Sequence, residues 1–329
     1  MPAAPATPAD EIRDVNSRYH DVAAPDYDSK WGISYEEVGR ALVAGKLRKA
    51  LGRSGRFERA LEIGAGTGYF SLNLLQAGAI GAATCTDISQ GMLDELSRSA
   101  ERLGLSESVD TARCDAQELP FPDDSFDLVF GHAVLHHLPD LDAAFREFRR
   151  VLKPGGMVAF CGEPSAYGDR LASVPKRAAM RVAPAWRRVL GVGRRIDDFA
   201  SDSEAAEHGL EHVVDVHAFT PRQLSAFASR AGFETVRVTG EELVAGWFGW
   251  TNRTLESTAD ARQIPRSWHL YAYRGYMLLK RLDDAVLERA LPPAIFYNLL
   301  MSARVPAEPV VDVDAVREPD ALPAAPASR

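Results

Sequence analysis

Cysteine is scarce in this chain of 329 residues: only Cys85, Cys114 and Cys161 occur, and no two of them form a C-x-x-C pair. Such spacing offers neither a disulfide framework nor a cysteine zinc site, and it is typical of a reducing compartment. The sequence also lacks an apolar run near the roughly 18 residues that a membrane span needs. Residues 1–10 lack the basic and apolar regions of a secretory signal. We therefore expect a cytoplasmic protein without a transmembrane segment.

An excess of positive charge is missing as well. The chain carries 38 Lys and Arg against 46 Asp and Glu, a formal net charge of −8. Binding along a phosphate backbone needs a basic face, so we expect no nucleic-acid partner. The 46% of hydrophobic residues is ordinary for a globular protein that buries a full core.

What the sequence does contain is an alternation of apolar strands and helices. The expected strands are 59–63, 82–86, 126–131, 156–161, 233–238 and 295–305, and the expected helices include 68–77, 90–103 and 141–152. Strands separated by helices of this length indicate a parallel sheet covered on both faces. Capping boxes at 34–37 and 220–223 predict two further helices, which end at Gly52 and Gly232.

Three closely spaced glycines follow the first of these strands. In "ALEIGAGTGYFSL", residues 60–72, Gly64, Gly66 and Gly68 come just after Glu62. Bare backbone between a strand and a helix lets N–H groups approach a ligand without Cβ clashes. The dinucleotide fingerprint GxGxxG does not fit, because its third glycine would fall on Tyr69 or Ser71. The pattern is E-x-G-x-G-x-G instead.

Further motifs follow in order. The second strand ends in "CTDIS", which places Asp87 about twenty residues past the glycines, where a carboxylate can accept ribose hydroxyls. Next come Asp115 and Ala116, then "FDLVFGHAVLHHL" at 126–138, and then "RVLKPGGMVAF" at 150–160. This ordered set resembles the class I S-adenosylmethionine-dependent methyltransferases over residues 58–163, and more loosely over 219–240 and 295–305.

The resemblance implies a Rossmann-like sheet of seven strands, mostly parallel with an antiparallel last strand, and S-adenosylmethionine as the cofactor. It implies that the glycine loop and Glu62 hold the methionine part, that Asp87 binds the ribose, and that Asp115 and Ala116 read the adenine. Ile88 and Met92 would pack on the adenine, and His132 would contact the cofactor through its backbone. Alternatively, Glu62 braces the loop, Asp87 caps a helix, and Ile88 and Met92 are ordinary core. The expected cofactor-binding residues are Tyr27, Glu62, Gly64, Gly66, Gly68, Asp87, Ile88, Met92, Asp115, Ala116 and His132.

Near the N-terminus, "RYHDVAAPDYDSKW" at 18–31 resembles the segment that many small-molecule methyltransferases fold over the cofactor. Tyr19, Tyr27 and Trp31 would line the pocket there, or anchor the segment to the core. His136 or His137 is a candidate general base, because imidazole titrates near neutral pH; packing or capping is the alternative role. Methyl transfer in line with the sulfonium can also proceed through proximity and exclusion of water alone.

Two insertions interrupt the strand–helix rhythm and are expected to form a mainly helical cap. Residues 247–276 of the second hold seven aromatic side chains, which suit an apolar or aromatic acceptor or form the insertion's own core. Residues 176–195 of the first insertion hold seven basic residues and no acidic one. They form either a solvated helix face or a contact for an anionic acceptor or a membrane surface. The expected units are a disordered tail (1–9), a helical segment (10–57), the cofactor core (58–163), an insertion (164–218), a core helix and strand (219–240), an aromatic insertion (241–293), the last strand (294–305) and a disordered tail (306–329).

Several alternatives remain at this point. His208, His212 and His217 lie close in sequence but lack a carboxylate motif, so we expect no metal site. No NPPY-like run occurs, and Cys161 follows Phe160 rather than proline, which disfavours nucleobase methylation and favours a small-molecule acceptor. Tyr276 and Lys280 match the YxxxK spacing of short-chain reductases, against the glycine pattern. A protein that binds S-adenosylmethionine without catalysis is the other alternative.

Overall fold

The chain folds around one sheet of seven strands. The structure is a computed structural model, and it describes residues 33–194 and 217–307 together with ten residues between 12 and 28. The strands are β1 (Phe57–Ile63), β2 (Ile80–Asp87), β3 (Val109–Arg113), β4 (Phe126–His132), β5 (Leu152–Pro164), β6 (Glu234–Glu241) and β7 (Asn298–Arg304). Their order across the sheet is β3-β2-β1-β4-β5-β7-β6, and β7 runs antiparallel to both neighbours. The predicted fold class is confirmed.

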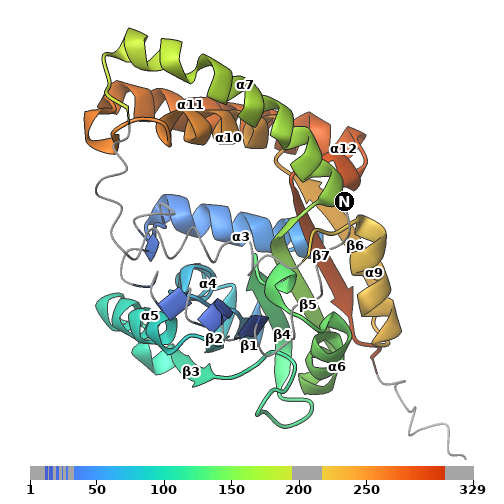
Figure 1. The fold of residues 1–329 in the computed structure, drawn as a ribbon. Coiled ribbons are helices and arrows are strands. Elements are labelled where there is room, and N and C mark those ends of the chain that lie inside the picture. The colour runs from blue at the N-terminus through green and yellow to red at the C-terminus, as the bar shows by residue number, and fades with distance from the viewer. Residues whose placement is uncertain are drawn as a thin grey trace, which may run out of the picture.

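Helices cover both faces of the sheet (Figure 1). They are α3 (Glu37–Leu51), α4 (Tyr69–Gln76), α5 (Gln90–Arg102), α6 (Leu141–Val151), α7 (Ala166–Leu190), α9 (Pro221–Arg230), α10 (Val244–Glu256), α11 (Arg266–Leu282) and the short α12 (Glu288–Ala290). Side chains alternate between the two faces of the sheet along β4. Val129 therefore packs with α6 and α9, whereas Leu128 and Phe130 pack with α3 and α4. The central strands are buried on both faces and read as continuous apolar runs, which is why the sequence indicated them. The sequence did not indicate β3, an edge strand without a buried residue.

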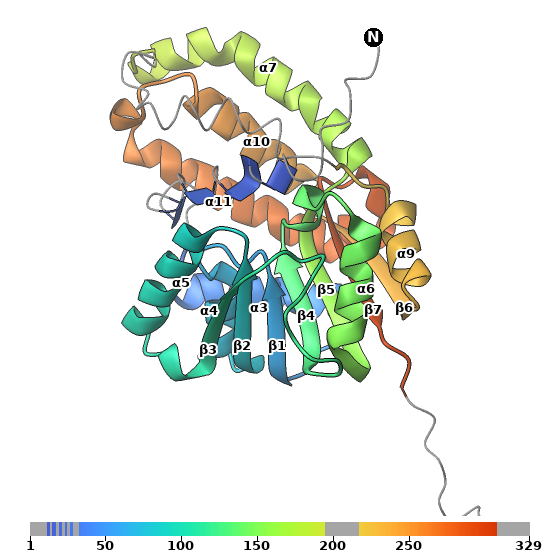
Figure 2. The same ribbon diagram turned by 60° about the horizontal axis from the view of Figure 1, so that its bottom comes forward.

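A layer of helices lies over the carboxyl ends of the parallel strands (Figure 2). Helix α7 follows β5 directly, α10 and α11 follow β6, and Figures 1 and 2 place α7 on the outer side of this layer. We call α7, α10 and α11 the cap. None of the described helices has the length and apolarity that crossing a bilayer requires.

The two predicted capping boxes have different outcomes. Thr220 and Gln223 form the reciprocal box, and their helix ends before Gly232. The box at Ser34 is wrong, because the helix begins only at Glu37 and its cap, Glu36, makes no side-chain bond. The Ser34 carbonyl instead accepts a hydrogen bond from Asn73, and the Tyr35 hydroxyl donates to the Thr67 carbonyl. These tertiary bonds outweigh the local signal. Gly52 ends the helix in the left-handed conformation, as expected.

Candidate active site

Two adjoining cavities open at the point where the strand order reverses, between β1 and β4. In open α/β sheets, ligands bind in the crevice outside the carboxyl ends of strands at such a point. The smaller cavity has a volume of about 120 Å³ and the larger one about 440 Å³. Residues that border both are His20, Tyr27, Gly64, Gly66, His132, Ala133 and His137.

The smaller cavity collects most of the residues that the sequence assigned to the cofactor. Its walls include Tyr27, Gly64, Gly66, Asp87, Ile88, Met92, Asp115, Ala116 and His132. Glu62 borders the larger cavity only, and Gly68 borders neither. Segments separated by up to about a hundred residues therefore meet at one crevice, as the topology of parallel strands requires.

Gly64 and Gly66 need to be glycine for different reasons. Both have positive φ, +62° and +52°. A Cβ on Gly64 would lie 2.4 Å from Val134 Cγ2, so this glycine serves close packing. A Cβ on Gly66 would meet no atom within 4 Å. The space beside Gly66 is thus open toward both cavities, and a ligand can approach its backbone.

Asp87 holds the glycine loop from the end of β2. Its Oδ2 accepts a hydrogen bond from Gly66 N–H at 2.9 Å, and its Oδ1 accepts one from Ser89 N–H at 2.9 Å. The residue is 8% exposed and faces the smaller cavity. Each carboxylate oxygen has two lone pairs, so both oxygens keep a site for a further donor.

Glu62 is a buried carboxyl group at the end of β1. Burial raises its pKa to about 8, although it accepts a hydrogen bond from Ser71 N–H at 3.1 Å. The bond to Ser71, in the first turn of α4, is the loop-bracing role that was the alternative for this residue. Because a nearby cation favours the charged form, the site is suited to a ligand ammonium.

Residues of the N-terminal segment complete the smaller cavity, and sequence reasoning missed most of them. Arg13 Nε lies 2.6 Å from Asp115 Oδ2, while the Gln117 amide donates to the same carboxylate. Asn16 and His20 also line the wall. The only sequence signal was the likeness of 18–31 to a cofactor-covering segment; Tyr19 and Trp31 lie outside the described residues.

Several aromatic side chains line the larger cavity. Tyr69 and Phe70 come from the start of α4, Trp250 from α10, and Tyr297 precedes β7. The Trp250 and Tyr297 rings are 5.3 Å apart, and Lys176 Nζ of α7 lies 4.0 Å from the centre of the Trp250 ring. The cap therefore supplies one wall of this cavity.

A buried carboxylate, Glu163, organises the turn after β4. Its Oε1 accepts hydrogen bonds from Val134 and Leu135 N–H, each at 3.0 Å. Its Oε2 lies 2.9 Å from His136 Nδ1 and accepts from His136 N–H. Glu163 has no exposed surface, and His136 borders the larger cavity. Donation from Nδ1 to Glu163 places the imidazole's acceptor lone pair on Nε2, the arrangement a general base needs.

The two neighbouring histidines differ from His136. Burial lowers the pKa of His132 to about 3, so its ring is neutral; it stacks on Phe70 with centroids 4.5 Å apart. His137 packs against the His136 ring at 3.9 Å and borders both cavities. Of the three histidines weighed for a metal, His217 is the one described, and its Nε2 lies 3.1 Å from the Leu138 carbonyl oxygen.

Four aromatic side chains of the cap pack on one another. Trp268 meets Trp186 and Tyr271, and Phe248 meets Tyr271. Of the seven aromatic residues in 247–276, only Trp250 borders a described cavity. The insertion's own packing therefore accounts for part of the run, and the role of these aromatics in acceptor binding stays a prediction.

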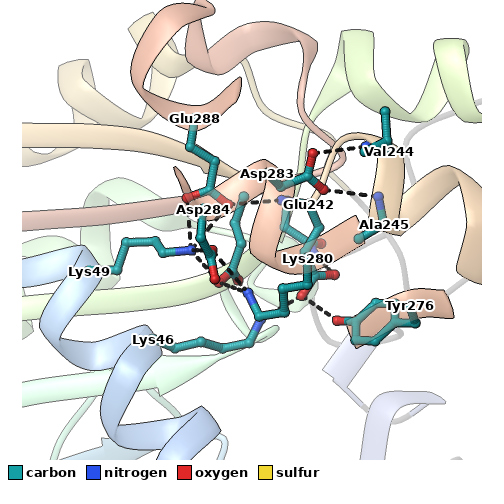
Figure 3. Close-up of polar contacts among 12 residues, drawn as sticks. Lys46, Lys49, Glu242, Val244, Ala245, Tyr276, Lys280, Asp283, Asp284 and Glu288 are labelled. Carbon is teal, nitrogen blue, oxygen red and sulfur yellow. Dashed lines mark hydrogen bonds and ion pairs between the residues drawn. The ribbon is translucent and has the colours of Figure 1, made fainter. Parts of the chain in front are cut away.

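A buried charge network fastens the cap to the core (Figure 3). Glu241, at the end of β6, accepts hydrogen bonds from Lys46, Lys49 and Lys280, and these ammonium groups hold its pKa below the usual range despite its burial. Lys49 Nζ also lies 2.6 Å from Asp284 and 2.8 Å from Glu288. The three carboxylates thus converge on a lysine.

The YxxxK pair belongs to the same part of the molecule. The Tyr276 hydroxyl donates to Glu242 at 2.7 Å, while Lys280 binds Glu241. Neither residue borders a described cavity. The spacing that matched a reductase therefore serves to hold α11 on the core.

Comparison with known proteins decides the family. Residues 61–160 match the model of a methyltransferase domain. The chain is 33% identical over 223 residues to the malonyl-[acyl-carrier protein] O-methyltransferase of Methylococcus capsulatus, covering 68% of this chain and 72% of that protein. This chain belongs to the class I S-adenosylmethionine-dependent methyltransferases. Its cofactor is S-adenosylmethionine, and the reductase and the non-catalytic alternatives are set aside.

Other methyltransferases agree. A ubiquinone/menaquinone biosynthesis C-methyltransferase from Burkholderia cenocepacia is 31% identical over 237 residues, 69% of this chain and 87% of that protein. The fold resembles phosphoethanolamine N-methyltransferase 2 of Haemonchus contortus, solved with S-adenosyl-L-methionine, at a TM-score of 0.55 and 17% identity over 94% of this chain and 62% of that chain. The open space at Gly66 and the buried Glu62 carboxyl suit this cofactor.

Proposed function

We propose that this methyltransferase methylates an apolar or aromatic small molecule held in the larger cavity. One observation carries the proposal: a 440 Å³ space lined by aromatic side chains adjoins the smaller cavity at the glycine loop. That volume falls in the usual range of about 300–1,000 Å³ for ligand pockets. The two sequence relatives are named for different acceptors, a malonyl-[acyl-carrier protein] and a quinone-biosynthesis substrate. The acceptor class proposed for this chain therefore rests on the cavity. A natural product or a lipid-like compound fits it, and the net charge of −8 disfavours nucleic acid.

The residues of this chain have distinct parts in the proposal. When bound, S-adenosylmethionine supplies a sulfonium with an activated methyl group. Glu62 and the glycine loop hold the amino-acid end, Asp87 accepts from the ribose, and Asp115 faces the adenine. The remaining proposed contacts are Tyr27, Ala116, Ile88, Met92 and the His132 backbone. We assign the acceptor side to the insertions 164–218 and 241–293 and the cofactor side to residues 58–163.

Positioning and exclusion of water supply most of the acceleration in this proposal. Holding nucleophile and methyl group in line is worth on the order of 7–11 kcal/mol in good cases. The cap and the N-terminal residues shield the encounter from water. His136 takes the proton that the acceptor loses, and Glu163 orients its ring through Nδ1. His137 is the second candidate base.

Turnover, measured as S-adenosylhomocysteine released, tests the proposal against aromatic hydroxyl compounds, quinone-like compounds and malonyl thioesters. Trp250→Ala should lower kcat/KM for the preferred acceptor about tenfold or more, since fully burying a large apolar side chain contributes on the order of 1.5–3 kcal/mol. Cofactor affinity should stay unchanged. Tyr273→Ala removes a cap aromatic that is 51% exposed and is the matched control. A polar preferred acceptor, or one indifferent to Trp250→Ala, contradicts the proposal.

A further inference from the structure

Exposed apolar side chains concentrate on the cap. Among the described residues, thirteen large hydrophobic side chains are exposed, and all but Val38 lie on α7, on α11 or in the turn that follows α11. Exposed apolar surface that is contiguous marks sites of interaction with proteins or membranes. Six of these twelve side chains lie on α7 alone.

Helix α7 arranges these side chains in a regular stripe. The outer stripe consists of Tyr167, Leu171, Val174, Ala178, Val182, Ala185 and Val189. At about 100° per residue, these positions fall within an arc of about 80° and extend for about 33 Å along the helix axis. Exposure is 65% at Val174 and 84% at Val189. The buried side of the helix, at Ala172, Ala179 and Ala183, points elsewhere, so the outer stripe is a second apolar face.

A row of arginines runs beside the outer stripe. Arg170, Arg177, Arg181 and Arg188 are exposed and fall within an arc of about 40°, centred about 80° from the stripe. Asp169 is the one acidic residue of α7. This local positive charge contrasts with the net −8 of the chain. An apolar stripe flanked by arginines is the pattern of helices that lie in the plane of an anionic bilayer surface.

We propose that the outer face of α7 docks this enzyme on an anionic membrane surface. The stripe enters the boundary between head groups and acyl chains while the arginine row pairs with anionic lipid. Pro164 and Trp250 both line the larger cavity. Helix α7 begins two residues after Pro164, and its Lys176 contacts the Trp250 ring. Docking would therefore bring the acceptor side close to the bilayer, although the docking itself does not depend on the acceptor proposed above.

Vesicle flotation with the full chain tests the proposal. The probes are phosphatidylcholine vesicles with and without about 30% phosphatidylglycerol, at low and at high salt. The protein should float with the anionic vesicles only, less at high salt. The variant Leu171→Ser/Val174→Ser/Val182→Ser and the variant Arg177→Glu/Arg181→Glu should each bind at least about tenfold more weakly.

Matched controls separate docking from general effects. Met180→Ser changes an exposed residue of α7 that the arginine row separates from the outer stripe. Val38→Ser changes the one exposed large apolar side chain off the cap among the described residues. Both should bind vesicles like the wild type. Every variant should keep its melting temperature and its affinity for S-adenosylhomocysteine, because the altered side chains border no described cavity.

Three results would overturn the proposal. Wild-type protein that does not bind anionic vesicles excludes docking. Dimers in sedimentation velocity that the serine variant abolishes would identify a second copy as the occupant. Loss of vesicle binding in the glutamate variant alone would show that the arginine row binds lipid without insertion of the stripe, which contradicts the proposed mode of docking.

Discussion

The two adjoining cavities are built in different ways. The walls of the smaller cavity come largely from short segments at the carboxyl ends of β1, β2 and β4, and backbone N–H groups such as that of Gly66 take part directly. The larger cavity draws walls from the glycine loop, from α10 and from the start of β7, which are far apart in sequence. Its shape therefore depends on how the cap is fastened. This difference suits a family whose members share a cofactor and differ in acceptors.

Removing Glu241 should have the largest effect, because it breaks the fastening of the cap. Glu241→Gln leaves the buried Lys280 and the partly buried Lys46 and Lys49 without their shared carboxylate. Breaking a buried ion pair costs about 3–5 kcal/mol of unfolding free energy. Urea unfolding measures the loss. The depressed pKa of Glu241 also predicts that its contribution is lost as the pH falls below about 4.5.

The matched control for the network is an exposed ion pair. Glu95→Gln, which breaks the contact with Arg98, should cost about 1 kcal/mol or less. A similarly small loss for Glu241→Gln would show that the cap is held by its apolar contacts, and the comparison between the cavities would lose its physical basis.

The next effect should fall on catalysis alone. His136→Asn keeps an N–H donor in reach of Glu163 but removes the base, and general-base loss typically lowers kcat by about 10²–10⁴-fold. The rising limb of the pH profile should disappear with it. His137→Asn, at the second candidate base, is the matched comparison variant. If kcat and the pH profile survive in His136→Asn, the histidine only positions the turn.

Asp87→Ala tests the cofactor side. The variant removes an acceptor of two backbone N–H bonds and of the proposed ribose contact, so the affinity for S-adenosylmethionine should fall by more than about tenfold while the protein stays folded. Calorimetry measures the affinity, and Asp94→Ala on the following helix is the control. Near-wild-type affinity would contradict the assignment of Asp87 to the ribose.

The smallest expected effect is a pH dependence of cofactor affinity. With a pKa raised to about 8, Glu62 holds a proton at neutral pH, and a bound ammonium favours its ionised form. Cofactor binding should then release a proton. The affinity should rise several-fold between about pH 6.5 and 8, by at most tenfold per pH unit. Titration in buffers of different ionisation enthalpy detects the proton.

The same raised pKa predicts the sign for the cofactor-free protein. Glu62 binds its proton more tightly in the folded than in the unfolded chain, so its contribution to stability declines as the pH rises from about 4.5 to 8. Glu62→Gln should remove both pH dependences. A flat affinity profile in the wild type would place the ammonium away from Glu62.

The features predicted from the sequence are those whose causes are local. Glycines after a buried strand and the Thr220 capping box depend on residues within a few positions of one another. The failed box at Ser34 shows the limit, because bonds from Asn73 and to Thr67 override the local pattern. Glu163 and Arg13 were missed since their partners lie 27 and 102 positions away and leave no periodic trace.

The sequence by itself indicated the fold class through its strand and helix periodicity, and it indicated the cofactor through the resemblance of its ordered motifs to the class I methyltransferases. Both signals are properties of short segments. Only the tertiary structure decided which residues line the larger cavity, how Glu163 orients His136, and that Lys46 and Lys49 meet Glu241 almost two hundred positions later. Such contacts form where elements pack, and their free energy depends on burial, which a linear sequence does not specify.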